Sequence, residues 1–119
     1  MDPNLDLGPI SPYLFGTNYG PMHAVHLDVM PLAEQAGFNI LRYPGGAWTD
    51  ANDIKLFQID QFIAFCKQVG AVPIISVRLL GGSPETAAEL VRYANIEKKY
   101  GVRYWSIGNE PNLYTELKQ

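Results

Sequence analysis

The chain has 119 residues, of which 47% are hydrophobic and 12% aromatic, and its nine basic and twelve acidic residues give a net charge of −3. This composition predicts one folded domain and excludes a disordered or fibrous chain. The basic residues are dispersed, with Lys98 and Lys99 as the only adjacent pair. Because no basic patch could follow a phosphate backbone, we do not expect nucleic acid as a partner.

The N-terminus, the apolar runs and the single cysteine bear on secretion, membrane insertion and disulfide bonding. Met1 is not followed by a basic region and an apolar core, so we expect no signal peptide and leave the location in the cell open. No apolar run approaches the length that spans a membrane, so we expect no membrane partner. The single cysteine, Cys66, excludes an intrachain disulfide, and its place on the apolar face of a predicted helix indicates a small buried hydrophobe.

Four short apolar runs alternate with helix-like patterns along the chain. The second run is closed by Pro44-Gly45-Gly46, a strong turn signal, and the third is almost continuously apolar, as in a strand covered on both faces. The alternation predicts parallel βα units in the order βαβαβαβ, forming one domain over residues 1–119, with a possible fourth helix beginning within 114–119. The predicted strands are 13–18, 39–43, 72–78 and 102–107.

Three amphipathic helices are predicted between these strands. The first begins near Asp28, tolerates Pro31 in its first turn and ends at Gly37, and the second ends at Gly70. The third begins with Ser83-Pro84-Glu85, which combine an N-cap, a first-turn proline and an acidic residue at the positive end of the helix dipole. The predicted buried faces are Val29, Leu32, Ala33 and Ala36; Leu56, Ile59, Phe62, Ile63, Phe65 and Cys66; and Ala87, Leu90, Val91 and Ala94.

The C-terminal ends of parallel strands are where active sites form in such folds, and polar residues follow each predicted strand. We expect no cofactor, since no glycine-rich phosphate loop follows the first strand. We expect no metal either, since His23 and His26 have no third ligand at suitable spacing. The residues at these strand ends are Thr17-Asn18-Tyr19, Arg42-Tyr43-Pro44-Gly45-Gly46-Ala47-Trp48, Ser76 with Arg78, and Asn109-Glu110-Pro111.

Several of these residues have an equally plain structural interpretation. Trp48 suits either stacking on a sugar ring or packing over the core, whereas Trp105 lies within a strand and is expected in the core. Arg78 is expected to pair with a carboxylate at the sheet ends. Asp50 and Asp53 follow the glycine turn and are expected to cap the second helix.

The segment Trp105-Ser106-Ile107-Gly108-Asn109-Glu110-Pro111 is similar to the fourth-strand signature of clan A glycoside hydrolases. Within that clan, Arg42-Tyr43-Pro44-Gly45-Gly46 resembles the second-strand segment of arabinofuranosidase-type enzymes, and Ser11-Pro12-Tyr13-Leu14-Phe15-Gly16 resembles their first strand. The resemblance covers nearly the whole chain in the right order. It implies the first four strands of a (β/α)₈ barrel, a half-barrel, because a complete barrel usually takes about 250 residues.

The resemblance also implies roles for the strand-end residues. Glu110 would be the general acid/base, and Asn109 would hydrogen-bond the sugar 2-hydroxyl. Arg42 would orient a catalytic carboxylate through bidentate hydrogen bonds. The substrate would be a carbohydrate, contacted by Asn18, Tyr43 and Trp48.

A retaining glycosidase also needs a nucleophilic carboxylate about 5–5.5 Å from the acid/base. In clan A this residue lies at the end of the seventh strand, and only four strands are predicted here. Three alternatives stay open: a half-barrel that needs a complementing chain for activity, a homo-oligomer in which two copies close a barrel, and a non-catalytic sugar-binding or structural module. Exposed apolar edges predict self-association of the lone chain.

Overall fold

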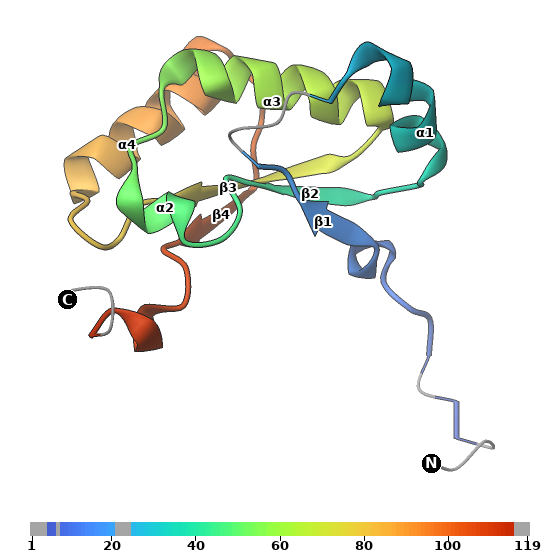
Figure 1. Cartoon of the computed structure of the whole chain (residues 1–119), viewed down its shortest axis with the longest axis horizontal. Helices are drawn as coiled ribbons and strands as arrows, with labels where there is room; N and C mark the ends of the chain where they lie inside the picture. Colours follow the sequence, from blue (N-terminus) through green and yellow to red (C-terminus); the bar gives the residue numbers. More distant parts are fainter. Residues whose placement is uncertain (1–4, 7, 21–24, 116–119) are drawn as a thin grey trace.

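The computed structural model describes residues 5–6, 8–20 and 25–115, and their strands form one parallel sheet. The strands are β1 (Gly16–Asn18), β2 (Ile40–Tyr43), β3 (Val72–Val77) and β4 (Tyr104–Ile107), paired in chain order. Helices alternate with them, so the predicted parallel βα architecture of half a TIM-type barrel is confirmed (Figure 1). Of the possible fourth helix at 114–119, only Tyr114 and Thr115 lie within the described residues.

The first strand is shorter than predicted. Residues Pro12–Leu14 form a 3₁₀ helix, and the Ser11 hydroxyl accepts a hydrogen bond from the Tyr13 amide at its start. A serine followed by proline favours a helical turn, because the serine caps the turn and the proline fixes its first φ angle. Extended structure therefore begins only at Gly16, where a Cβ atom would collide with Ile40 of the neighbouring strand.

The helices α1 (Met30–Gln35), α3 (Leu56–Val69) and α4 (Pro84–Arg92) lie on one face of the sheet, and α2 (Trp48–Ala51) is a single turn after β2 (Figure 1). The predicted end of α3 at Gly70, in the left-handed conformation, is confirmed. The predicted start of α4 is also confirmed, because the Ser83 hydroxyl accepts a hydrogen bond from the Thr86 amide. After α4 the chain continues as a π-helix over Tyr93–Glu97.

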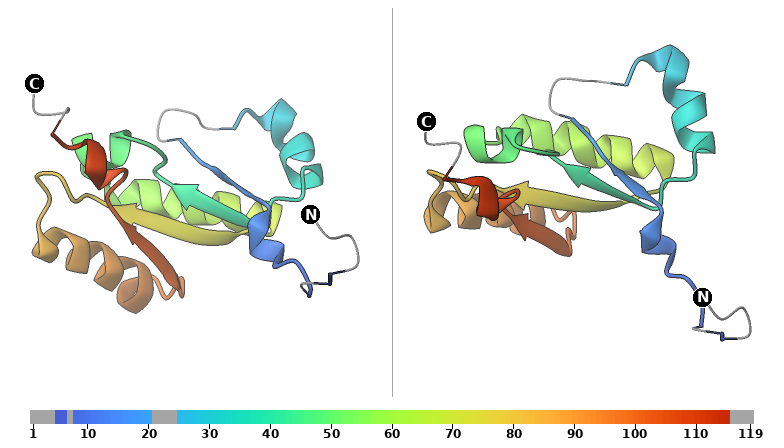
Figure 2. Two further views of the ribbon diagram at one scale, coloured as in Figure 1. Left: turned by 90° about the horizontal axis from the view of Figure 1, so that it is seen from below. Right: turned by 60° about the horizontal axis from the view of Figure 1, so that its bottom comes forward.

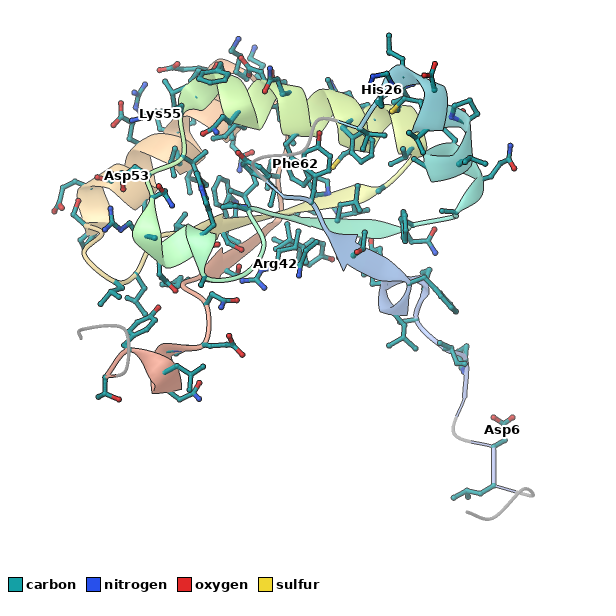
Figure 3. All side chains as sticks on the ribbon, viewed as in Figure 1. Asp6, His26, Arg42, Asp53, Lys55 and Phe62 are labelled. Atoms are coloured by element: carbon teal, nitrogen blue, oxygen red, sulfur yellow. The ribbon has the colours of Figure 1, made fainter. Side chains whose placement is uncertain are left out.

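The hydrophobic core lies between α3 and the sheet, where Phe62 is fully buried (Figure 3). Cys66 is buried there as predicted, and burial raises the pKa of its thiol to about 12. Trp105 is half-buried against the same cluster, which confirms its expected place at the core. The fully buried apolar side chains are Leu41, Ile59, Phe62, Ile75 and Ala94.

All three predicted helix faces were partly wrong. Val29 and Leu32, expected in the core, are 44% and 62% exposed, and in the first helix only Met30 is buried. The reason is that α1 has only six residues and packs along a small part of α3. Val91 and Leu56, near the ends of their helices, are also exposed, each at 37%.

The opposite face of the sheet carries no α-helix from the described parts of the chain (Figure 2). The sheet curves toward this open face: the rings of Tyr13, just before β1, and Tyr104 of β4 meet edge to face with centroids 5.8 Å apart. These two residues belong to opposite edges of the sheet, so the open face is concave. Within the described residues no helix is both long and apolar enough to cross a membrane.

Candidate functional site

Three of the predicted site residues meet at the C-terminal edge of the concave face. Arg42, near the end of β2, donates from Nη2 to the Asn109 side-chain oxygen at 3.1 Å. The Asn109 amide nitrogen in turn donates to the Glu110 carboxylate at 3.2 Å. The structure thus brings Arg42, Asn109 and Glu110 into one hydrogen-bonded chain, although 67 positions separate Arg42 from Asn109.

Two serines extend this chain along the concave face. Arg42 Nε donates to the Ser76 hydroxyl at 2.8 Å, and Ser76 lies 2.6 Å from the Ser106 hydroxyl. A guanidinium only donates, so Ser76 accepts from Arg42 and its own proton is available for Ser106. Both serines lie in the strand-end motifs noted in the sequence, but no role was predicted for them. Their pairing depends on the register between β3 and β4, which the sequence does not show.

Glu110 adopts an uncommon backbone conformation. Its φ of +46° lies in the left-handed region, which costs energy for any residue except glycine. The preceding Gly108 also has a positive φ, and a Cβ atom there would lie 2.4 Å from the Tyr114 hydroxyl and 2.8 Å from Leu79 Cβ. The turn after β4 is therefore tight, and it presents the Glu110 side chain to solvent.

The three residues predicted to contact sugar lie in different environments. Asn18 is exposed and lines, with Arg42, an open hollow of about 480 Å³ on the concave face. Trp48 is half-buried and packs against the core, as the packing interpretation expects. Tyr43 is 2% exposed and stacks on Phe62 at 5.1 Å between the sheet and α3, so the structure does not bring it to the site. Burial raises the pKa of the Tyr43 hydroxyl to about 12.

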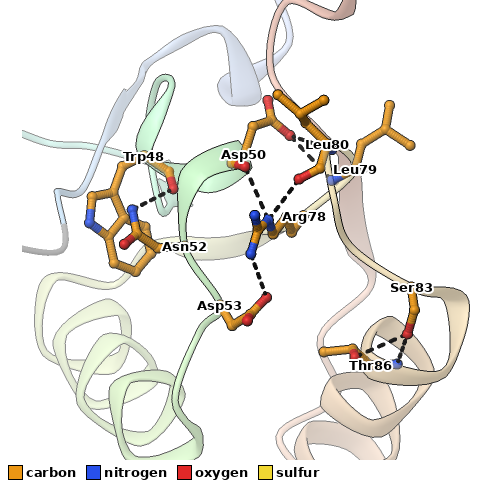
Figure 4. A network of polar contacts seen from close by, with 9 residues as sticks. All are labelled: Trp48, Asp50, Asn52, Asp53, Arg78, Leu79, Leu80, Ser83 and Thr86. Atoms are coloured by element: carbon orange, nitrogen blue, oxygen red, sulfur yellow. Dashed lines mark hydrogen bonds and ion pairs between the residues drawn. The ribbon is translucent and has the colours of Figure 1, made fainter. Parts of the chain in front are cut away.

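The expectation that Asp50 and Asp53 cap the second long helix was wrong. The N-cap of α3 is Lys55, whose backbone amide donates to the Gln58 side chain. Asp53 instead pairs with Arg78 at 3.4 Å, which confirms the expected carboxylate partner of that arginine (Figure 4). Asp50 is buried within α2 and accepts hydrogen bonds from the strand-end loops of β3 and β4.

The side chain of Arg78 connects the loops after β2 and β3. Its Nε donates to the backbone carbonyls of Leu80 and Asp50, at 2.7 Å and 3.0 Å (Figure 4). These bonds hold the ends of the two strands together. No group of three metal-binding side chains occurs among the described residues, and His23 lies outside them. His26 is exposed and lies 3.3 Å from Asp28.

No family model matches the chain, but comparisons with individual proteins find relatives. The intracellular exo-α-(1→5)-L-arabinofuranosidase of Streptomyces lividans is 25% identical, aligning with 92% of this chain and 25% of its own length. The α-L-arabinofuranosidase C of Emericella nidulans is 24% identical over 70% of this chain and 24% of its own length. The chain therefore spans about a quarter of the length of the curated relatives it matches.

Solved structures give a consistent result. The α-L-arabinofuranosidase of Thermotoga maritima, in complex with arabinose, superposes with a TM-score of 0.58 at 25% identity, over 70% of this chain and 25% of its own. A family 51 α-L-arabinofuranosidase from Bifidobacterium longum reaches a TM-score of 0.67 at 18% identity, over 83% of this chain and 31% of its own. The chain is thus similar at low identity to α-L-arabinofuranosidases, and its architecture is that of half of a TIM-type barrel.

Proposed function

We propose that this half-barrel carries the acid/base side of a retaining glycosidase site. The observation that supports this function best is the chain of hydrogen bonds from Arg42 through Asn109 to Glu110 at the C-terminal edge of the sheet. In barrels of this architecture that edge holds the active site. The relatives are named as arabinofuranosidases, so arabinofuranosides are the first substrates to test.

Each of the three residues has a defined part in this proposal. Glu110 protonates the glycosidic oxygen and then deprotonates the attacking water. Asn109 is held between Arg42 and Glu110 and binds the sugar 2-hydroxyl. Arg42 uses Nε and Nη2 for Ser76 and Asn109. Its Nη1 group makes no hydrogen bond within the described part of the chain, and it is available for a carboxylate.

The proposed chemistry requires more than this half-barrel. A glycosidase acid works best with its pKa raised toward neutrality by an apolar wall and a second carboxylate. Glu110 is exposed, and in the described residues no helix or strand covers the concave face above it. We infer that further βα units supply the wall and the nucleophile, and that the half-barrel by itself does not turn over substrate.

The test is complementation with the remaining βα units of a related enzyme, followed by hydrolysis of an aryl α-L-arabinofuranoside. We expect turnover only in the mixture, and we expect Glu110→Gln to lower the rate by roughly 10²–10⁴-fold, the usual contribution of a general acid/base. Glu85→Gln, at the exposed start of α4, is the matched control and should leave the rate unchanged. Turnover that Glu110→Gln does not affect would overturn the assignment.

A second candidate function is that of a carbohydrate-binding or structural half-barrel that self-associates. It is favoured by large apolar side chains exposed at the sheet margins, such as Leu14 at 71% and Ile107 at 68%. Exposed apolar patches and unpaired strand edges favour association. Light scattering should show a mass that rises with concentration and falls in Ile107→Lys. A stable monomer at high concentration would contradict this candidate.

A further inference from the structure

Asp50 is a buried carboxylate for which the proposed chemistry has no use. It lies in the single turn α2, after β2, and the residue is only 3% exposed. A buried charge is costly unless hydrogen bonds stabilise it. The bonds that Asp50 accepts come from the loops after the two following strands, so this one side chain connects three strand ends. Figure 4 shows its bonds to the loop after β3.

The two carboxylate oxygens of Asp50 serve different loops. One oxygen accepts the backbone amides of Leu79 and Leu80 after β3, at 3.2 Å and 3.4 Å. The other accepts the backbone amide of Asn109 after β4, at 2.8 Å. The shortest of these bonds therefore reaches the residue directly before Glu110.

The turn that holds Glu110 needs such a constraint. A non-glycine residue stays in the left-handed region only where its surroundings fix it, and Glu110 has a φ of +46°. Its side chain is exposed, so that side chain does not anchor the turn. The bonds that fix the turn include those of Asn109 to Asp50 and Arg42 and the Gly108 amide on the Val77 carbonyl at 2.8 Å. On the far side, the Glu110 carbonyl accepts from the Leu113 amide at 2.9 Å.

We propose that Asp50 is a positioning residue, whose buried carboxylate holds the Asn109 amide and thereby fixes the turn that presents Glu110. Only the expected effect of Asp50 on catalysis rests on the proposed function. Burial opposes the charge of Asp50, but the hydrogen bonds from Asn109, Leu79 and Leu80 outweigh this effect and lower its pKa. The carboxylate is therefore ionised at neutral pH, when its bonds to the amides are strongest. The Tyr114 hydroxyl approaches the same carboxylate, although its oxygen makes no hydrogen bond of good geometry.

The first experiment measures amide hydrogen exchange in the intact chain by NMR. In Asp50→Asn, exchange at Asn109 should become roughly tenfold faster or more, because the substitution removes the negative charge and leaves one accepting oxygen for the amides of two loops. Asp53→Asn is the matched control: Asp53 lies three residues away, is half-exposed and, among the described residues, bonds to Arg78 alone. Exchange at Asn109 that is unchanged in Asp50→Asn, or equally fast in both variants, would overturn the proposal.

A second measurement needs no substitution at Asp50 and applies even if that variant does not fold. The amide proton shifts of Asn109 and Leu79 are followed against pH in the wild-type chain. They should share one transition in the acid range, and it should persist in Asp53→Asn and Glu110→Gln, which remove the other nearby carboxylates of the described residues. Among those residues, the remaining charged or titratable side chains around the turn are Arg42, Arg78 and Tyr114. Absence of a transition at Asn109, or its loss in either variant, would contradict the proposal.

A third readout separates positioning from a purely structural role. In the complemented enzyme, Asp50→Asn should lower kcat at least tenfold while KM stays within roughly twofold, because displacing the acid/base affects the transition state more than substrate binding. Unchanged kcat with faster amide exchange would reduce Asp50 to a structural residue and overturn the proposal. If the complemented wild type shows no turnover, the proposed function fails. Amide exchange and the pH dependence of the amide shift at Asn109 then test by themselves whether Asp50 holds the turn.

Discussion

The two faces of the sheet differ in what covers them. The convex face is packed by α3 and α4, and its side chains, such as Leu41 and Ile75, are fully buried. The concave face carries Arg42 and the serine pair, open to solvent in the described part of the chain, with the hollow beside them. The comparison teaches that stability and the candidate chemistry are separated: the convex face holds the half-barrel together, and the concave face carries the residues of the candidate site.

Removing a side chain from the core between α3 and the convex face of the sheet should have the largest effect on stability. Phe62→Ala deletes a fully buried ring that stacks on Tyr43, and such deletions cost about 3–5 kcal/mol. Phe57→Ala, one helix turn and a half earlier and 59% exposed, is the matched control and should cost much less. Urea unfolding of both variants measures the difference. Equal costs would show that the convex core does not carry the stability.

A smaller effect, dependent on pH, is expected on the outer side of the same helices. Asp60 of α3 accepts hydrogen bonds from Tyr93 and Tyr100, at 2.7 Å and 2.6 Å, and lies 3.4 Å from Lys98. Burial opposes its charge, but these partners outweigh burial and lower its pKa. A carboxylate with a lowered pKa adds stability above its unfolded value of about 3.9, and this is lost as the pH falls through the folded pKa.

The variant Asp60→Asn should therefore be less stable than the wild type at pH 7, and the difference should shrink below about pH 4. Urea midpoints across this range measure it. Tyr93→Phe and Tyr100→Phe, which each remove one hydroxyl donor, serve as controls and should each reproduce part of the loss at neutral pH. A difference that grows toward acid would contradict the assigned direction of the pKa shift.

The smallest effect is expected at α1. Leu32 has the sequence pattern of a core residue but is 62% exposed, so Leu32→Ser should change the free energy of unfolding by no more than about 0.5 kcal/mol. Leu90→Ala in α4, where the leucine is 5% exposed, is the contrast and should cost about 2–5 kcal/mol. A large cost at Leu32 would show that α1 docks more tightly than its exposure indicates.

The sequence by itself determined the local features, because these depend on neighbours in the chain. The helix caps at Ser83 and Gly70 follow from short-range turn chemistry, and the order of strands and helices follows from the apolar pattern. The position of Glu110 at a strand end follows from the same pattern together with its motif. The alternation of side chains along a strand also explains why Tyr43 lies away from the site, since it and Arg42 must point to opposite faces.

Only the tertiary structure decided which distant groups meet. The register between β3 and β4 pairs Ser76 with Ser106. Asp50 was expected to cap a helix, but the fold buries its carboxylate, which accepts hydrogen bonds from the loops after β3 and β4. The exposure of Leu32 was decided in the same way, because burial depends on whether another element covers a helix face. The local sequence pattern shows which side chains can be buried or hydrogen-bonded. Tertiary packing determines which of these side chains are buried or bonded in the fold.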